Sequence, residues 1–147
     1  EDSVRIRCDA APDMAGLPQA LMEGFVPDEA AQKGITDCFR YGWTAKKTGD
    51  AITFLAEGSC IAVQYRKSVK LPAPVALAVV DDDTEHAVRL DANFDETWGD
   101  KLELTTLLEH GKEGRHIVTI RLAETHADDA VPFYLVSVIA TGRRGRD

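Results

Sequence analysis

The sequence predicts an all-β fold, an antiparallel β-sandwich of jelly-roll type with a short irregular or helical N-terminal segment. Short strand-like stretches recur along most of the chain, and Gly, Asp and Pro residues separate them. The composition, 147 residues with 44% hydrophobic and 29% charged side chains, is typical of one soluble globular domain. A chain of this length buries about 70% of its unfolded surface, so its core needs no covalent support.

The expected strands alternate apolar and polar residues or are apolar throughout. The chain turns at Gly58 and Ser59 to form a hairpin, and an acidic turn beginning at Asp81 joins the next two strands. Strands are expected at residues 3–8, 50–57, 60–66, 73–80, 85–90, 101–109, 115–122 and 131–140.

The first third of the chain differs from the rest. Residues 17–34 hold at most one or two short helices, because two prolines and two glycines interrupt them: Pro18, Gly24, Pro27 and Gly34. Residues 35–43 return to strand-like composition. We therefore divide the chain into an N-terminal strand and linker-like segment (1–34), a β-sandwich domain (35–142) and a basic tail (143–147).

Charge excludes two classes of partner. The formal net charge is −8 and the isoelectric point about 5.0, so nucleic acids and anionic membrane surfaces are repelled. The short basic tail does not reverse this balance. No apolar stretch is long enough to cross a bilayer, and none resembles a signal peptide. The chain begins at Glu1, which suits a processed or excised piece, and the compartment stays open between cytoplasmic and secreted.

The cysteines and histidines indicate no metal or cofactor. There are three cysteines and no C-x-x-C pair, so neither a disulfide framework nor a zinc site is indicated; Cys60 is interpreted as a small buried residue, and a Cys8–Cys38 bridge stays open. His116 alternates in register with apolar residues, so we expect a buried histidine with a hydrogen-bonded partner.

Two short patterns are reminiscent of an esterase. Residues 49–53 match the nucleophile block of GDSL hydrolases, with Ala51 where the serine belongs, and Asp83 and His86 have the D-x-x-H spacing of the same enzymes. Acyl transfer on serine needs the missing oxygen. The two blocks are also only about one hairpin and a strand apart, too close for that fold. We therefore expect no catalytic residue in this chain.

An acidic loop offers candidate ligand-binding residues. Asp91, Asn93 and Asp95 have the i, i+2, i+4 spacing of a calcium loop, but the next residue is Glu96, where an EF-hand requires glycine. A solvated acidic turn is the preferred interpretation, and a calcium ion stays an alternative. Trp98, in the same loop, is able to stack on a sugar ring or to cap the open end of the sandwich.

Trp43 has the same two interpretations. An indole face covers the C–H groups of a sugar, while carboxylates and amides bond its hydroxyls. The candidate carbohydrate-binding set is therefore Trp98, Trp43, Asp91, Asn93 and Asp95.

The order of several stretches resembles a known domain. "FRYGW", "AITFLAEGSCIAVQYR", "VALAVVDDD", "LDANFDETWG" and "GRHIVTIRLAE" follow one another within residues 39–140. Together they resemble the jelly-roll or galactose-binding-like β-sandwich domain that accompanies many bacterial SGNH/GDSL-family hydrolases. Asp82 and Asp83 replace the turn glycine of that pattern, and Ala92 replaces its loop glycine.

This resemblance implies a non-catalytic accessory domain of a carbohydrate-esterase-like hydrolase. Its implied partners are the catalytic domain of the same parent chain and carbohydrate. One alternative is an interdomain or homo-oligomer interface built on the apolar side chains of the N-terminal segment, Leu17, Leu21, Met22 and Phe25. Another is a free-standing carbohydrate-binding domain without esterase activity.

Overall fold

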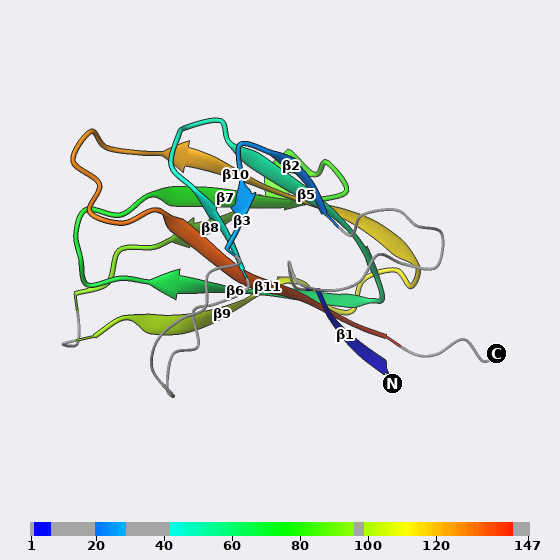
Figure 1. Ribbon diagram of the computed structural model, residues 1–147. Helices are drawn as coiled ribbons and strands as arrows, with labels where there is room; N and C mark the ends of the chain where they lie inside the picture. Colours follow the sequence, from blue (N-terminus) through cyan, green and yellow to red (C-terminus); the bar gives the residue numbers. More distant parts are fainter. Residues whose placement is uncertain (1, 7–19, 29–41, 96–98, 143–147) are drawn as a thin grey trace.

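The computed structural model describes residues 2–6, 20–28, 42–95 and 99–142, and Figure 1 shows two β-sheets packed face to face. In the first sheet the order is β3-β4-β11-β6-β9, and β1 also pairs with β11. The second sheet has the order β2-β5-β10-β7-β8. All pairs between these strands are antiparallel. The predicted all-β sandwich is confirmed.

The strands of the first sheet are β1 (Asp2–Ile6), β3 (Val26–Pro27), β4 (Trp43–Ala45), β6 (Cys60–Lys67), β9 (Lys101–Leu108) and β11 (Phe133–Gly142). Those of the second are β2 (Ala20–Glu23), β5 (Ala51–Glu57), β7 (Val75–Val80), β8 (Val88–Asp91) and β10 (Arg115–Glu124). A single turn of 3-10 helix, η1 (Thr84–His86), lies between β7 and β8.

The N-terminal segment contributes strands to both sheets. β1 lies beside β11, and β2 lies beside β5 at the edge of the second sheet. Within residues 2–6 and 20–28 the structure contains strands and no helix. The segment was expected to be irregular or to hold at most one or two short helices, whereas its described residues form strands; the rest of the segment lies outside the described residues. A domain boundary at residue 34 stays a prediction.

The strand after the acidic turn is shorter than predicted. Residues 85–90 were expected to be extended, but η1 occupies the first of them and β8 begins only at Val88. Asp81 and Asp82 both have positive φ, 55° and 59°, and the Asp83 N–H donates to the Val80 carbonyl at 3.0 Å, so the chain leaves β7 through a tight turn of type I′ character before it enters η1.

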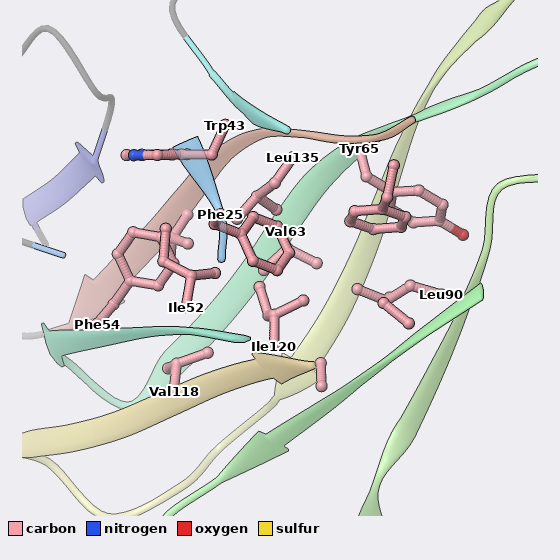
Figure 2. Packing of buried hydrophobic residues seen from close by; sticks show 14 of the residues in the cluster. Phe25, Trp43, Ile52, Phe54, Val63, Tyr65, Leu90, Val118, Ile120 and Leu135 are labelled. Carbon is pink, nitrogen blue, oxygen red and sulfur yellow. The ribbon is translucent and has the colours of Figure 1, made fainter. Parts of the chain in front are cut away.

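Aromatic side chains pack together in the core between the two sheets (Figure 2). Trp43 of β4 meets Phe54 of β5 edge-on across the interior, with ring centroids 5.1 Å apart. Tyr65 of β6 stacks on Phe133 of β11 at 5.8 Å, and Phe25 contacts Phe133 edge-on at 6.3 Å. Alternation along residues 52–57 of β5 and 115–122 of β10 points every second side chain into this core, as the sequence pattern predicts.

Antiparallel pairing gathers the connections at two ends of the sandwich. We call the end formed by residues 46–50, 68–74, 92–100 and 125–132 the first loop end; residues 96–98 of this end lie outside the described residues. The second loop end consists of residues 58–59, 81–87 and 109–114. Among the described residues, no helix has the length and apolar character that a membrane span requires.

His116 ties two turns together at the second loop end. It is 6% exposed, its Nδ1 lies 2.6 Å from Asp81 Oδ2, and its Nε2 lies 2.5 Å from the Lys112 carbonyl oxygen. Because both ring nitrogens face acceptors, the doubly protonated imidazolium suits this place. The predicted buried and partnered histidine is confirmed.

The same contacts shift both ionisation equilibria. The hydrogen bond to Asp81 raises the pKa of His116 above its ordinary value; burial opposes this shift and the Lys112 carbonyl reinforces it. The pKa of Asp81 is lowered by its bond to His116 and by the Ile117 backbone N–H, which donates to Oδ1 at 2.8 Å.

This ion pair predicts a pH-dependent contribution to stability. The raised pKa of His116 gives stability that is complete below about pH 6.5 and is lost as pH rises through the folded-state pKa. The lowered pKa of Asp81 gives stability that is present above about pH 3.8 and is lost as pH falls through its folded-state pKa. Urea denaturation should therefore show that Asp81→Asn lowers the free energy of unfolding most between these two pH values.

The matched control is Asp82→Asn, which changes the next carboxylate of the same turn and keeps a residue that tolerates positive φ. A loss for Asp81→Asn that is the same at every pH would contradict an ionised pair.

Candidate functional site

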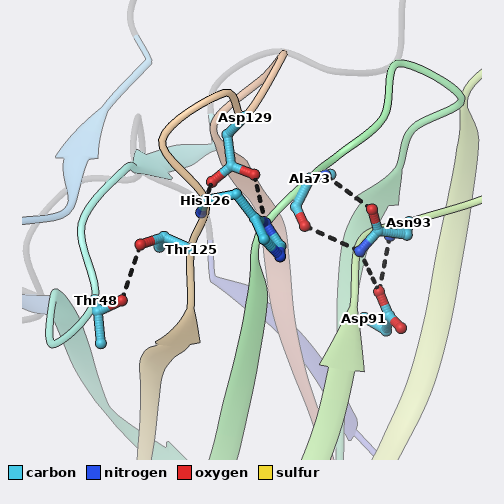
Figure 3. A network of polar contacts seen from close by, with 7 residues as sticks. All are labelled: Thr48, Ala73, Asp91, Asn93, Thr125, His126 and Asp129. Carbon is cyan, nitrogen blue, oxygen red and sulfur yellow. Dashed lines mark hydrogen bonds and ion pairs between the residues drawn. The ribbon is translucent and has the colours of Figure 1, made fainter.

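The first loop end is held together by hydrogen bonds between its connections. The Ala130 N–H donates to the Pro72 carbonyl at 2.9 Å, and the Thr48 and Thr125 hydroxyls lie 2.9 Å apart (Figure 3). Ser68 exchanges two backbone hydrogen bonds with the 92–95 stretch, donating to Ala92 at 2.7 Å and accepting from Phe94 at 3.1 Å. Loops joined in this way present a preformed surface.

Asn93 connects the end of β8 to the loop at 68–74. Its Oδ1 accepts from the Ala73 N–H at 2.8 Å, and its Nδ2 donates to the Ala73 carbonyl at 2.9 Å (Figure 3). The side chain thus pairs with Ala73 as a neighbouring strand would. Nδ2 also donates to Asp91 Oδ1 at 2.7 Å, so both amide donors are occupied.

Asp91 orients Asn93 from one side. Its Oδ1 accepts from the Asn93 backbone N–H at 2.9 Å as well as from the amide. Burial raises the pKa of Asp91, but the two bonds from Asn93 and the nearby Arg89 and Lys67 charges outweigh it, so the pKa lies below the ordinary value. Asp91 and Asn93 therefore shape the loop through contacts within the chain.

Asp91 also interacts with the buried side chain of Tyr65. Burial raises the pKa of Tyr65 to about 12, with a smaller rise from the charges of Glu103 and Asp91. Hydrogen bonds with Thr105 and with the Asp91 backbone lower it in part. The phenol therefore stays neutral over the ordinary pH range and forms hydrogen bonds at the edge of the core.

The other predicted loop residues are placed differently. Asp95 is exposed at the surface of the first loop end, whereas Trp98 lies outside the described residues. Asp100 accepts from Ser68 Oγ at 2.9 Å and from the Val69 N–H at 3.1 Å. Among the described residues, no group of three or more His, Cys, Asp or Glu side chains is placed to hold a metal ion.

Trp43 does not match its predicted ligand-binding role. Its side chain is only 1% exposed and packs against Phe54 between the sheets, so no ring face is open to a sugar. The preceding Gly42 permits this packing, because a Cβ there would lie 2.2 Å from the Leu135 carbonyl oxygen. The alternative interpretation of Trp43 as a core residue fits its position.

A hollow of about 350 Å³ at the same end was not predicted from the sequence. Its lining combines charged, apolar and proline side chains: Lys46, Pro74, His126, Ala127, Asp129, Ala130, Val131 and Pro132. Asp129 Oδ2 accepts from the His126 N–H at 2.9 Å, and Oδ1 lies 2.9 Å from His126 Nδ1 (Figure 3). An H-x-x-D spacing across a turn is the signal that could have indicated this pair.

The two esterase-like patterns lie at opposite ends of the sandwich. Ala51 begins β5 near the first loop end, whereas Asp83 and His86 bond each other at 2.7 Å in the second loop end. These residues therefore do not form one catalytic site.

The Asn93 contacts predict a specific loss. Asn93→Ala leaves the Ala73 N–H and carbonyl without their partner, which should lower the free energy of unfolding by about 1–3 kcal/mol and speed amide exchange at Ala73. Chemical denaturation and hydrogen exchange measure the two effects. The control Asp95→Ala, two residues on and exposed, should change stability by less than about 0.5 kcal/mol. Equal effects of the two variants would show that the hydrogen bonds between the Asn93 side chain and Ala73 do not stabilise the fold.

The chain is similar to parts of solved carbohydrate-active proteins. No family model matches the sequence, and no curated protein matches it. A two-domain esterase active on acetylated mannans, solved also with mannopentaose, shares 59% identity at a TM-score of 0.88; the match covers 99% of this chain and 38% of the esterase with mannopentaose. The chain thus spans less than two fifths of that esterase.

More distant structures share the fold alone. A family two carbohydrate esterase from Cellvibrio japonicus matches 97% of this chain and 34% of its own at 15% identity and a TM-score of 0.62. A family 35 carbohydrate-binding module from Clostridium thermocellum matches 95% of this chain and 98% of its own at 12% identity and a TM-score of 0.53. The expected resemblance to an esterase-associated β-sandwich is confirmed, while the SGNH/GDSL class stays a prediction.

Proposed function

We propose that this chain is a non-catalytic accessory domain of a two-domain carbohydrate esterase and that its first loop end contacts glycan. The observation that carries the proposal is the 59% identity, over 99% of this chain, to part of an esterase active on acetylated mannans. The sandwich it shares with a carbohydrate-binding module supports the glycan part.

The chemistry of the first loop end supports contact with sugar hydroxyls. Lys46 offers a cation, and His126 and Asp129 offer polar atoms beside the apolar edges of Pro74 and Pro132. Asp95, in the 92–100 connection of the same loop end, adds an exposed carboxylate. Polar groups beside apolar surface are what a sugar ring requires, since its hydroxyls and C–H faces alternate. In this proposal Asp91 and Asn93 position the loop, and Trp98 is the candidate stacking residue.

The catalytic chemistry belongs to the other domain of the parent protein. Position 51 carries a buried alanine where the GDSL pattern requires a nucleophilic serine. We propose an SGNH/GDSL hydrolase as the class of that domain, on the resemblance of residues 39–140. The accessory domain then supports the catalytic domain or holds the glycan near it.

An interface role is the second candidate, and exposed side chains of the N-terminal segment favour it. Leu21 and Met22 of β2 are exposed, as that hypothesis requires, whereas Phe25 is buried against Phe133 and Leu17 lies outside the described residues. A free-standing carbohydrate-binding domain is the remaining alternative, and the parent reading frame distinguishes it.

Calorimetric titration of the chain with mannopentaose tests the glycan contact. We expect saturable binding, and Lys46→Ala should weaken it about three- to tenfold because it removes a hydrogen-bond donor at the hollow. The control is Lys112→Ala, an exposed lysine at the second loop end, which should leave the affinity unchanged. Absence of heat at millimolar sugar would remove the binding role and leave only support of the catalytic domain.

A further inference from the structure

We propose that the outer face of the second sheet, across β2, β5 and β10, is the surface on which the catalytic domain docks. The inference rests on the proposed function, because it requires a second domain in the parent protein. It assigns a surface that is separate from the first loop end.

Three large apolar side chains are exposed on this face. Leu21 of β2 is 64% exposed, Leu55 of β5 is 57% exposed, and Ile117 of β10 is 41% exposed. We call these three residues the outer patch. Strand register brings them together, because Leu21 lies opposite Thr53, which is two residues from Leu55 on the same face of β5.

The register between β5 and β10 completes the outer patch. Ile117 lies directly opposite Leu55, and Thr119 lies opposite Thr53. Their neighbours Phe54 and Val118 are buried in the core, so the patch residues point away from it. On the far side of Thr119, half-buried Val79 of β7 extends the same face.

Charged residues of both signs surround the outer patch. Glu57 and Arg115 face each other beyond Leu55 and Ile117. Glu23 and Arg121 both face Ala51, on the opposite side of the patch. An apolar centre with a polar rim is the arrangement of a protein interface, and such a rim suits a partner that carries charges of both signs.

The chemistry of this face favours a protein over a sugar. Sugar rings stack on aromatic side chains, but the only Phe, Tyr or Trp within the five strands of this sheet is Phe54, which is buried. Aliphatic side chains such as Leu21 and Leu55 instead fit the apolar surface of another domain.

The length of the related esterase indicates which protein docks here. This chain corresponds to 38% of that two-domain protein, so most of such a polypeptide lies outside the chain. A domain on the same polypeptide has a high effective concentration, so a patch of a few residues suffices to hold it. A stable dimer of separate chains needs a larger surface, usually about 1,200 Å² or more in total.

The test uses the polypeptide of the full reading frame, with a protease site placed between the two domains. After cleavage, we expect the halves to remain associated, and Leu55→Asp should weaken their association at least tenfold by calorimetry. Leu104→Asp is the matched control. Leu104 is also 57% exposed, but it lies on β9 of the first sheet, opposite Gln64. Leu104→Asp should therefore change the affinity between the two halves less than about twofold.

The outcomes separate this inference from the proposed function. Equal effects of the two variants on the affinity between the halves, or a larger effect of Leu104→Asp, would overturn the docking surface. The accessory role would still stand in that case if the intact polypeptide has esterase activity. Self-association of the 147-residue chain that Leu55→Asp abolishes, without binding to the other half, would assign the patch to a second copy instead. A reading frame without a second domain would overturn both.

Discussion

Packing between the two sheets is the constraint on which the rest of the structure depends. Trp43 and Phe54 meet across the interior (Figure 2). Phe25, next to the short strand β3, contacts Phe133 edge-on. The Trp43–Phe54 contact joins the first sheet to the second, and antiparallel pairing then sends four connections to one end. The hollow beside His126 exists because of that convergence. Burial of rings this large makes the arrangement costly to change.

Polar contacts refine what the core establishes. At the first loop end, Asn93 replaces a missing strand neighbour for Ala73. At the second loop end, His116 and Asp81 join two turns through an ion pair in which the histidine is almost fully buried. Each cluster satisfies backbone or ring atoms that would otherwise lack partners. The two ends are thus held together by different contacts, and each has a hollow whose lining combines polar and apolar side chains.

Local patterns in the sequence predicted most of the fold but only part of the site. The alternation of apolar and polar residues predicted the bounds of β5, β6 and β10 to within two residues and placed His116 in the interior. This works because a strand that buries one face repeats its apolar residues at every second position. Burial of Trp43 could not be predicted, since it depends on Phe54 in the opposite sheet. The strands β2 and β3 were missed because prolines and glycines dominate the stretch around them. The contact between His126 and Asp129 depends on the geometry of a turn, which the alternation of apolar and polar residues does not predict.

The most direct test of glycan contact at the first loop end is a chemical-shift titration of the isotope-labelled chain with mannopentaose. We expect the backbone amide shifts that respond to sugar to fall at the first loop end, at the non-proline residues of 46–50, 68–74, 92–100 and 125–132. Residues 58–59, 81–87 and 109–114 at the second loop end should not respond. Responses confined to the second loop end, or to the outer face of the second sheet, would contradict the account.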